Sequence, residues 1–494
     1  MAQWIAGGAP VGAQATESGD RDHGQRIHHC DIPATLVVAG PEALPAWSPR
    51  LPGRIVNSRN SRFSTIHLRW NVERHSRAFR VKVVEPARYS PRENSDLFTD
   101  IVTSLLVPEP SEVDRLGVEA PTTGSERFDL LTFPEIFVSA ETLVTTVESL
   151  LGVTWSGCMH VGLRPSTEAA THLFSCGELR KLVARLAPLA ESIASDLLSF
   201  RGWLDRQATG WFNVGCLMAV DVDGQVRLCL HPKIVRSRHE VSPTTDRHMT
   251  EADLLVLVTL LPADRQFLSV TIQPLLCSDL LGTETDAPGG PPLEAITRHA
   301  GSFEGGPPDH VDVVSVATCT PQPKFAPKVG KASFDWHDQF RDAFKRAADG
   351  PDCVRHRFSI IVLSNFLQLG SEVDGGLSGV FMPVPPGAGP FHRDIAVSTW
   401  GRPRDGRGNN SWSGPGDNAL TKWENRGFVA GLDPFAASAQ ATVRIFAFTV
   451  QRLPRERALW RHSDGLAQCK VSCGERDGSG PVRFRDVEDG NASK

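Results

Sequence analysis

The sequence lacks the features that mark membrane proteins and nucleic-acid-binding proteins. Lys plus Arg (52) nearly balance Asp plus Glu (57), which gives a formal net charge of -5, and no block of like charge is long enough to bind a polyanion. The longest apolar region, residues 253–276, is interrupted by Pro262, Asp264 and Arg265 and cannot span a bilayer. The first residues show no basic start followed by an apolar core, which argues against a secretory signal. We therefore expect a soluble, cytoplasmic protein that binds neither nucleic acid nor membrane.

Common cofactor and nucleophile motifs are also missing. The chain contains no GxGxxG, P-loop, HExxH or GxSxG motif. Its ten cysteines have no framework spacing and lie mostly in apolar runs, which indicates reduced thiols rather than disulfides. Two small clusters, His28–Cys30 and Cys469 with Cys473, have no second ligand pair at metal-binding spacing. The sequence therefore predicts no cofactor and no metal.

Composition divides the 494 residues into an extension, a folded region and a tail. Residues 1–75 are rich in Gly, Pro, Ser, Arg and His, which predicts an irregular, disordered extension. From residue 76 to about 455, apolar runs suited to strands alternate with amphipathic stretches suited to helices, the pattern of an α/β domain. Residues 456–494 are polar, and we expect a disordered tail there.

The apolar pattern within the folded region predicts its elements. Strands are expected at 79–86, 128–138, 156–163, 252–262, 267–281, 310–321, 357–365, 378–384 and 441–453. Helices are expected at 96–107, 140–152 and 336–350, with a further amphipathic helical segment within about 165–208 that contains Pro188. Residues 210–235 predict a hairpin with its turn at Asp223-Gly224, and the Gly/Pro/Trp-rich stretch at about 384–428 predicts a long loop that is either functional or mobile.

Three reactive side chains end apolar runs. Glu135 follows LLTFP, Lys233 follows RLCLHP, and Cys277 follows VTIQPLL. Strand ends meet at one edge of the sheet in α/β enzymes, so these residues can converge. A thiol can act as nucleophile, a carboxylate as general base, and an ammonium can keep that carboxylate ionised and stabilise an oxyanion. This set predicts hydrolysis through a thioester or a thioimidate.

The segments that carry these residues resemble the nitrilase superfamily, the carbon-nitrogen hydrolases. FDLLTFPE is similar to the family's strand ending in Pro-Glu, FNVGCLMAVDVDGQVRLCLHPK to its Asn-containing strand, Asp-Gly turn and Lys, and LLCSD to its Cys-x-Asp or Cys-x-Glu motif. Further similar segments follow in the family's order across about residues 78–385. The resemblance implies a four-layer α-β-β-α sandwich with a helical insertion at about 165–208, assembled as a homodimer through its helical faces.

The resemblance also implies further site residues. Glu240, seven residues after Lys233, is expected to be a supporting acid that orients the lysine or the substrate, and Ser278 and Trp336 are expected to bind substrate. The chain departs from the family after the cysteine, where Leu280 and its neighbours stand in place of an arginine-bearing turn. Binding of a substrate carboxylate at that point is therefore not expected.

Three functional hypotheses remain open at the level of sequence. The leading one is hydrolysis of a non-peptide carbon-nitrogen bond in a small molecule, with an amide or N-carbamoyl substrate favoured over a nitrile. The second is a nitrilase-fold binding or regulatory subunit of a larger assembly. The third is acyl transfer to an amine by the same three residues.

Overall fold

The computed structural model describes the part of the chain to which all structural statements below refer. Its residues are 64–72, 78–106, 128–153, 155, 157–169, 171–237, 240, 247–262, 269–281, 311–320, 358–366, 378–383, 395–398, 443–452, 460–461, 468–476 and 482–486.

One of the two large sheets has seven strands. In spatial order these are β1 (Ser64–Val72), β10 (Leu254–Pro262), β11 (Val270–Leu276), β12 (Val311–Ala317), β13 (Phe358–Ser364), β14 (Gly379–Pro383) and β15 (Ile395–Ser398). The β1–β10, β11–β12 and β12–β13 pairs are parallel, and the other three pairs are antiparallel. The sheet is therefore mixed, and its parallel centre, β11–β12–β13, includes the strand that precedes Cys277.

The second large sheet has ten strands. Its main path runs β19 (Val482–Asp486), β18 (Gln468–Arg476), β16 (Val443–Arg452), β2 (Ala78–Pro86), β3 (Leu130–Thr132), β5 (Cys158–Arg164), β8 (Val214–Val220) and β9 (Val226–Pro232), with β17 (Trp460–Arg461) beside β16 and β4 (Val138–Ser139) beside β5. Strands β2, β3 and β5 are parallel, whereas β8 and β9 form the predicted antiparallel hairpin. The protein is therefore a mixed α/β structure with parallel and antiparallel pairing in each sheet.

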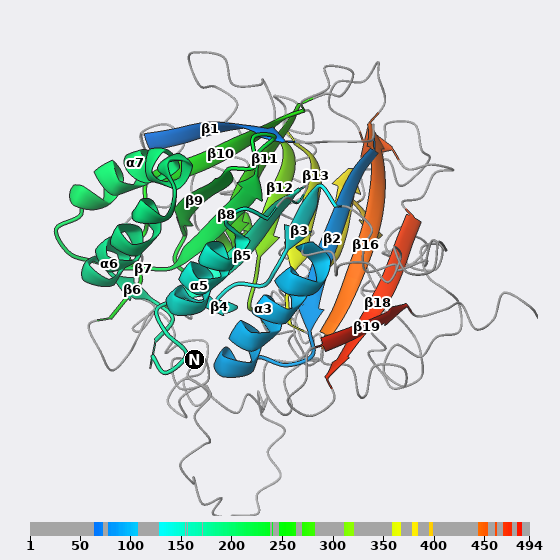
Figure 1. Cartoon of the computed structure of the whole chain (residues 1–494), viewed down its shortest axis with the longest axis horizontal. Coiled ribbons are helices and arrows are strands. Elements are labelled where there is room, and N and C mark those ends of the chain that lie inside the picture. Colours follow the sequence, from blue (N-terminus) through cyan, green and yellow to red (C-terminus); the bar gives the residue numbers. More distant parts are fainter. Residues whose placement is uncertain are drawn as a thin grey trace, which may run out of the picture.

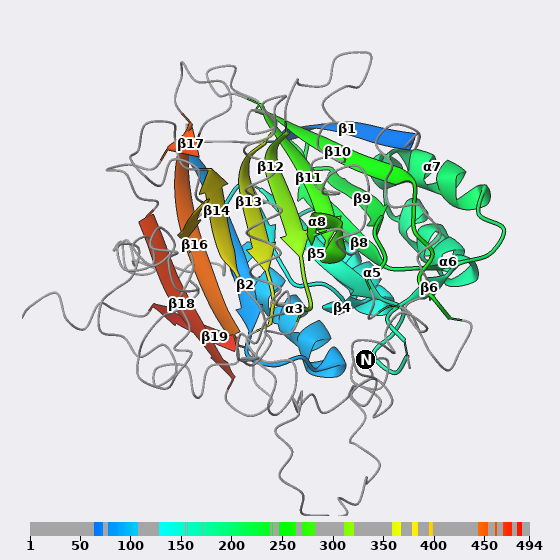
Figure 2. The same ribbon diagram turned by 180° about the vertical axis from the view of Figure 1, so that it is seen from behind.

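The two large sheets pack face to face through a mostly apolar interface. Figure 1 views the molecule from the side of the ten-stranded sheet, and Figure 2 shows the seven-stranded sheet from behind. Buried polar groups cross the interface at more than one point. Ser315 Oγ lies 3.0 Å from Thr132 Oγ1 and 2.8 Å from His160 Nδ1, and Ser364 Oγ of β13 donates to Val84 O of β2. His160 Nε2 in turn lies 3.0 Å from His231 Nε2. These hydrogen bonds fix the register of one sheet against the other.

Helices cover the outer face of the ten-stranded sheet (Figure 1). They are α3 (Pro91–Leu106), α5 (Ala140–Leu150), α6 (Cys176–Leu186) and α7 (Glu191–Asp205), with the 3₁₀ helix η3 (Ala187–Leu189) between the last two. Ser139 caps α5, and Ser175 forms a reciprocal capping box with Glu178 at the start of α6. No helix among the described residues has both the length and the apolar character needed to cross a membrane.

A group of aromatic side chains supports the segment that contains Glu135. Phe133 and Phe137 stack with ring centroids 5.4 Å apart, and Phe98 of α3 meets the ring of Phe133 edge-on at 5.0 Å. All three rings are fully buried. Because aromatic groups carry much of the energy of a packed core, this cluster anchors both ends of the turn that projects Glu135.

Several predictions about the limits of the domain were wrong. Part of the expected 1–75 extension, Ser64–Val72, forms β1, which pairs in parallel with β10 along its whole length. The expected disordered tail at 456–494 contributes β17, β18 and β19. The loop expected at 384–428 contains β15, and its remaining residues lie outside the described part of the chain.

Other predictions held with changes in detail. The helical segment expected within 165–208 is present but is divided into α6 and α7 at η3, because Pro188 lacks the N–H that a continuous helix would need. The strand expected at 128–138 is split into β3 and β4, and Glu135 lies in the break. The helix predicted at 336–350 lies outside the described residues, which show helices on one outer face of the sheets.

Candidate active site

Three chain breaks bring the predicted catalytic residues to one edge of the packed sheets. Glu135 lies between β3 and β4, Lys233 follows β9, and Cys277 lies between β11 and α8 (Ser278–Leu281). The end of β12 joins two of them. The Cys277 N–H donates to Ala317 O over 3.0 Å, and the Glu135 N–H donates to Thr318 O over 3.2 Å. Successive carbonyls of one strand end therefore fix the thiol-bearing and carboxylate-bearing backbones relative to each other.

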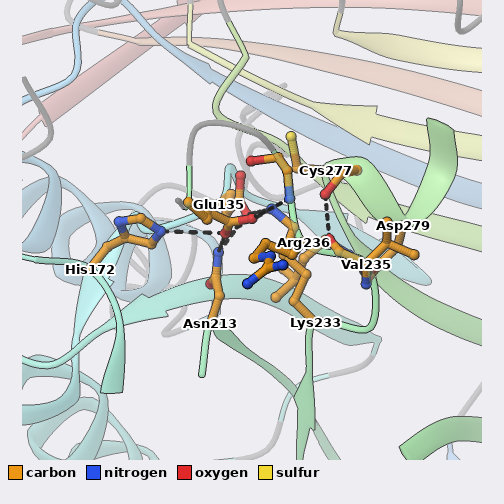
Figure 3. Close-up of polar contacts among 12 residues, drawn as sticks. Glu135, His172, Asn213, Lys233, Val235, Arg236, Cys277 and Asp279 are labelled. Carbon is orange, nitrogen blue, oxygen red and sulfur yellow. Dashed lines mark hydrogen bonds and ion pairs between the residues drawn. The ribbon is translucent and has the colours of Figure 1, made fainter. Parts of the chain in front are cut away.

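Four buried side chains form a closed hydrogen-bond network at this edge (Figure 3). The Lys233 ammonium donates to Glu135 Oε1 and to Glu240 Oε1, each over 2.9 Å. Asn213 Nδ2 donates to the same two oxygens over 2.7 and 2.8 Å. None of the four residues is more than 5% exposed. Because two donors share two carboxylate oxygens, all four side chains are held in one arrangement.

The charges in this network stabilise one another against burial. Burial alone would lower the pKa of Lys233, but the carboxylates of Glu135 and Glu240 raise it well above its ordinary value. Burial alone would raise the pKa of Glu240, but Lys233 holds it well below its ordinary value, with help from His172 and Asn213. The centre therefore contains an ammonium and an ionised Glu240 at neutral pH.

Cys277 lies in a strained turn and keeps its proton. Its φ of 40° is in the left-handed region that residues other than glycine rarely adopt. The Sγ atom shares a 2.9 Å hydrogen bond with Thr320 Oγ1. Burial, followed by the charge of Glu135, raises the pKa of Cys277 to about 12, although Lys233 and Thr320 act in the opposite direction. Attack by this sulfur therefore requires a base that removes the proton during the reaction.

Asp279 ties the cysteine turn to the segment after Lys233. Its Oδ1 accepts hydrogen bonds from the N–H groups of Ile234 (2.9 Å) and Val235 (2.7 Å), and its Oδ2 accepts from Leu276 (3.0 Å). Burial raises the pKa of Asp279 to about 7, against the effect of Lys233 and these backbone donors. Ser278 Oγ adds a 2.6 Å hydrogen bond to Val235 O. The turn that presents Cys277 is thus bonded directly to the segment that presents Lys233.

The turn that carries Glu135 approaches β5 at a glycine. Gly162 donates its N–H to Pro134 O (3.1 Å) and accepts from the Phe137 N–H (2.9 Å), so it brackets the turn. Ile136 has a φ of 52°, a second left-handed residue that is not glycine. A Cβ atom at position 162 would lie 2.4 Å from Glu135 Cα. The position of Glu135 therefore depends on the absence of a side chain at residue 162.

Comparisons with known proteins identify no relative. No protein-family model matches the chain, and no curated protein matches its sequence. The functional argument therefore depends on the geometry described above.

The structure brings together most of the site residues that the sequence predicted. Glu135, Lys233 and Glu240 share direct contacts, and Cys277 is close enough for the charges of all three to affect its pKa. The hydroxyl of Ser278, which was expected to bind substrate, donates a hydrogen bond to Val235 O. Trp336, also expected to bind substrate, lies outside the described residues. Within the described part of the chain, no group of three or more His, Cys, Asp or Glu residues could hold a metal ion.

Sequence reasoning did not assign four residues of the site. They are Asn213, His172, Thr320 and Asp279. Asn213 lies at the start of a strand rather than at its end, and His172 lies before α6 within the 165–208 segment that was predicted as a helical insertion. Thr320 lies three residues beyond the end of β12. The Cys-x-Asp motif pointed to Asp279 by position, but its contacts with the segment after Lys233 require the fold.

Proposed function

We propose that the chain is a carbon-nitrogen hydrolase of the nitrilase type that acts on an amide or N-carbamoyl group of a small molecule. One observation carries the proposal: the protonated, strained Cys277 lies beside a buried network in which Glu135, Glu240 and Asn213 surround Lys233. A thiol nucleophile, a carboxylate base and a fixed ammonium are the groups that acyl transfer through a thioester requires.

In the first half of the proposed reaction, Glu135 removes the thiol proton as Sγ of Cys277 forms a bond to the substrate carbonyl carbon. The electron pair of the carbonyl π bond moves onto its oxygen, and the Lys233 ammonium stabilises that oxyanion. The tetrahedral intermediate then collapses, the carbon-nitrogen bond breaks, and the leaving nitrogen takes the proton from Glu135. The products are a free amine or ammonia and a thioester on Cys277.

In the second half, Glu135 removes a proton from water as the water oxygen attacks the thioester carbon. The new intermediate collapses with cleavage of the carbon-sulfur bond, and the proton returns from Glu135 to the Cys277 sulfur. The enzyme is regenerated and a carboxylic or carbamic acid leaves. Glu240 is ionised throughout and holds Lys233 next to Glu135.

The remaining sequence expectations form part of the same proposal. They comprise a complete four-layer α-β-β-α sandwich, a homodimer that packs through helical faces, substrate contacts by Ser278 and Trp336, and a cytoplasmic location. Two packed sheets with helices on one outer face support the first of these.

The test is a screen for ammonia release from amides, N-carbamoyl compounds, nitriles and ureas by the full chain. Mass spectrometry of acid-quenched samples should show an acyl group on the Cys277 peptide. Cys277→Ala should abolish both signals, whereas Cys158→Ala, which removes a fully buried thiol from β5, should retain them in folded protein. Turnover of the same substrate by Cys277→Ala at the wild-type rate would refute the assignment.

The same screen separates the two alternatives. Acyl transfer predicts that added hydroxylamine or a small amine gives an acylated amine in place of the acid. A binding or regulatory subunit predicts neither product formation nor an acyl group on Cys277. Alkylation rate alone is a poor discriminator, because the pKa of about 12 keeps the resting thiol protonated.

A further inference from the structure

The α6–α7 unit, which we define as residues 174–212, is closed at its base by a two-stranded sheet. Its strands are β6 (Phe174–Ser175) and β7 (Trp211–Phe212), which pair in antiparallel register. Trp203 of α7 packs edge-on against Phe212 at 5.1 Å and donates its Nε1–H to Asp253 over 2.9 Å. The chain therefore enters and leaves this helical unit at neighbouring points.

The residues that flank the two ends of the unit both contact Glu240. His172 lies two residues before β6, and its Nε2 is 3.5 Å from Glu240 Oε1. Asn213 directly follows β7, and its Nδ2 donates to the same oxygen over 2.8 Å. In Figure 3, His172 and Asn213 both point toward the central carboxylate network, His172 from the left and Asn213 from below. The base of the helical unit thus lies directly against the proposed catalytic centre.

Asn213 also connects the other members of the network. Besides Glu240, its amide donates to Glu135, and its backbone carbonyl accepts the Lys233 N–H over 2.8 Å. A second cation in this position would compete with Lys233 for the carboxylates, whereas a neutral amide adds donors without adding charge. Asn213 therefore orders two buried carboxylates and leaves Lys233 as their shared ammonium.

The unused atoms of both side chains argue against a role in packing alone. His172 Nδ1 and Asn213 Oδ1 are buried, and neither atom has a hydrogen-bond partner among the described residues. An unpaired buried polar atom destabilises a fold, and apolar side chains would fill the same space without that penalty. What these two residues provide is the pair of N–H groups directed at Glu240.

We propose that His172 and Asn213, which flank the α6–α7 unit, act as positioning residues that hold Glu240 in place to present Lys233 to Glu135 and the substrate. The proposal rests on the proposed function for its catalytic consequence. The structural part, the dependence of Glu240 on these two residues, can be measured without any substrate.

The electrostatic environment of Glu240 makes this dependence observable. Lys233 and His172 are the charged or titratable groups bonded to it, and Arg236 and Cys277 also interact with its charge. Burial acts to raise the pKa of Glu240, and Lys233, His172 and Asn213 together hold it well below the ordinary value. Loss of one N–H donor to a buried carboxylate should raise the midpoint by about one to two pH units.

The experiment is a ¹³C NMR titration of glutamate carboxyl groups in the full chain, with Glu240→Gln to assign the signal. Wild type should show Glu240 ionised across the range in which the protein is folded. Asn213→Leu should raise its midpoint toward that range, and His172→Phe should do so to a smaller extent. His172→Gln retains a donor and should behave more like wild type. Leu198→Ala, at an exposed position of α7, is the matched control and should change nothing.

The outcomes of this titration test the positioning role separately from the proposed function. If Glu240 titrates identically in wild type, Asn213→Leu and His172→Phe, the positioning role is refuted even if the protein hydrolyses amides. If the midpoint moves, the role is supported even if no substrate is found. With a substrate in hand, the acidic limb of the kcat profile should move to higher pH in the same variants. If Asn213→Leu shows no cooperative unfolding transition, and is therefore not folded, the test relies on His172→Phe.

Discussion

Replacement of Gly162 in β5 by alanine should displace Glu135, the proposed general base. The added Cβ would lie 2.4 Å from Glu135 Cα and 2.6 Å from Ile136 N. Non-bonded carbon atoms pack at about 3.5–4.0 Å, so the two backbones must separate by about 1 Å. Both partners are backbone atoms in a hydrogen-bonded bracket, and no side-chain rotation can relieve the contact. We expect a loss of roughly 1–3 kcal/mol in the free energy of unfolding, as for other overpacked cores.

The catalytic effect of Gly162→Ala should exceed its effect on stability. A displacement of about 1 Å in a catalytic group can cost on the order of 100-fold in rate. Urea unfolding and hydrolysis rates would be measured beside Gly202→Ala, where a Cβ meets no atom within 4 Å. That control lies inside α7 and should gain about 0.5–1 kcal/mol because alanine favours helices. Equal stability and equal rates in Gly162→Ala and wild type would refute the close approach and its role.

Three further predictions test other parts of the site and core. Burial lowers the pKa of His231 to about 3, below the value of about 6.5 in an unfolded chain, so this residue loses stabilising effect as pH falls below 6.5. The stability of wild type relative to His231→Gln should therefore fall by up to about 1.4 kcal/mol per pH unit between pH 6.5 and 4.5, and parallel urea curves would contradict this. At a pH above 7, where the Asp279 carboxyl with its pKa of about 7 is ionised, Asp279→Asn places an amide donor against the Leu276 N–H and should cost about 1–3 kcal/mol in thermal unfolding, and an unchanged stability would contradict this. Thr320→Val removes the hydrogen bond that lowers the pKa of Cys277, whereas Thr320→Ser retains a hydroxyl. At alkaline pH, iodoacetamide should therefore label Cys277 more slowly in Thr320→Val than in Thr320→Ser.

Elements with uninterrupted apolar runs could be predicted because burial on both faces leaves a local signal. Strands β5, β8 and β11 are buried along their whole length, and each corresponds to a predicted strand. Glu135, Lys233 and Cys277 were conspicuous for the same reason, since each interrupts such a run at its end. Polar residues at the ends of the strands that were easy to predict therefore do lie at one edge of the packed sheets.

Strands that mix polar and apolar residues could not be predicted from the sequence. In β1, the sequence STIHLRWNV buries Ile66, Trp70 and Val72 while half-buried or exposed side chains separate them. This strand adds to β10, which lies far along the chain, so its stability comes from a pairing that no local window contains. The same holds for β18, which pairs with β16. Both strands lie in regions whose overall composition is polar and rich in glycine, so composition alone did not predict them.

Asn213 shows that hairpin register could have extended the sequence prediction further than strand ends alone. The turn at Asp223-Gly224 fixes which residues face each other across β8 and β9, and the register pairs Val214 with Pro232. One step beyond that pair are Asn213 and Lys233, which the structure joins through the Lys233 N–H and the Asn213 carbonyl. In an antiparallel hairpin, the start of one strand and the end of the other lie at the same edge of the sheet. A polar residue at the start of β8 was therefore as strong a candidate as the lysine at the end of β9, and only its contacts with Glu135 and Glu240 required the three-dimensional fold.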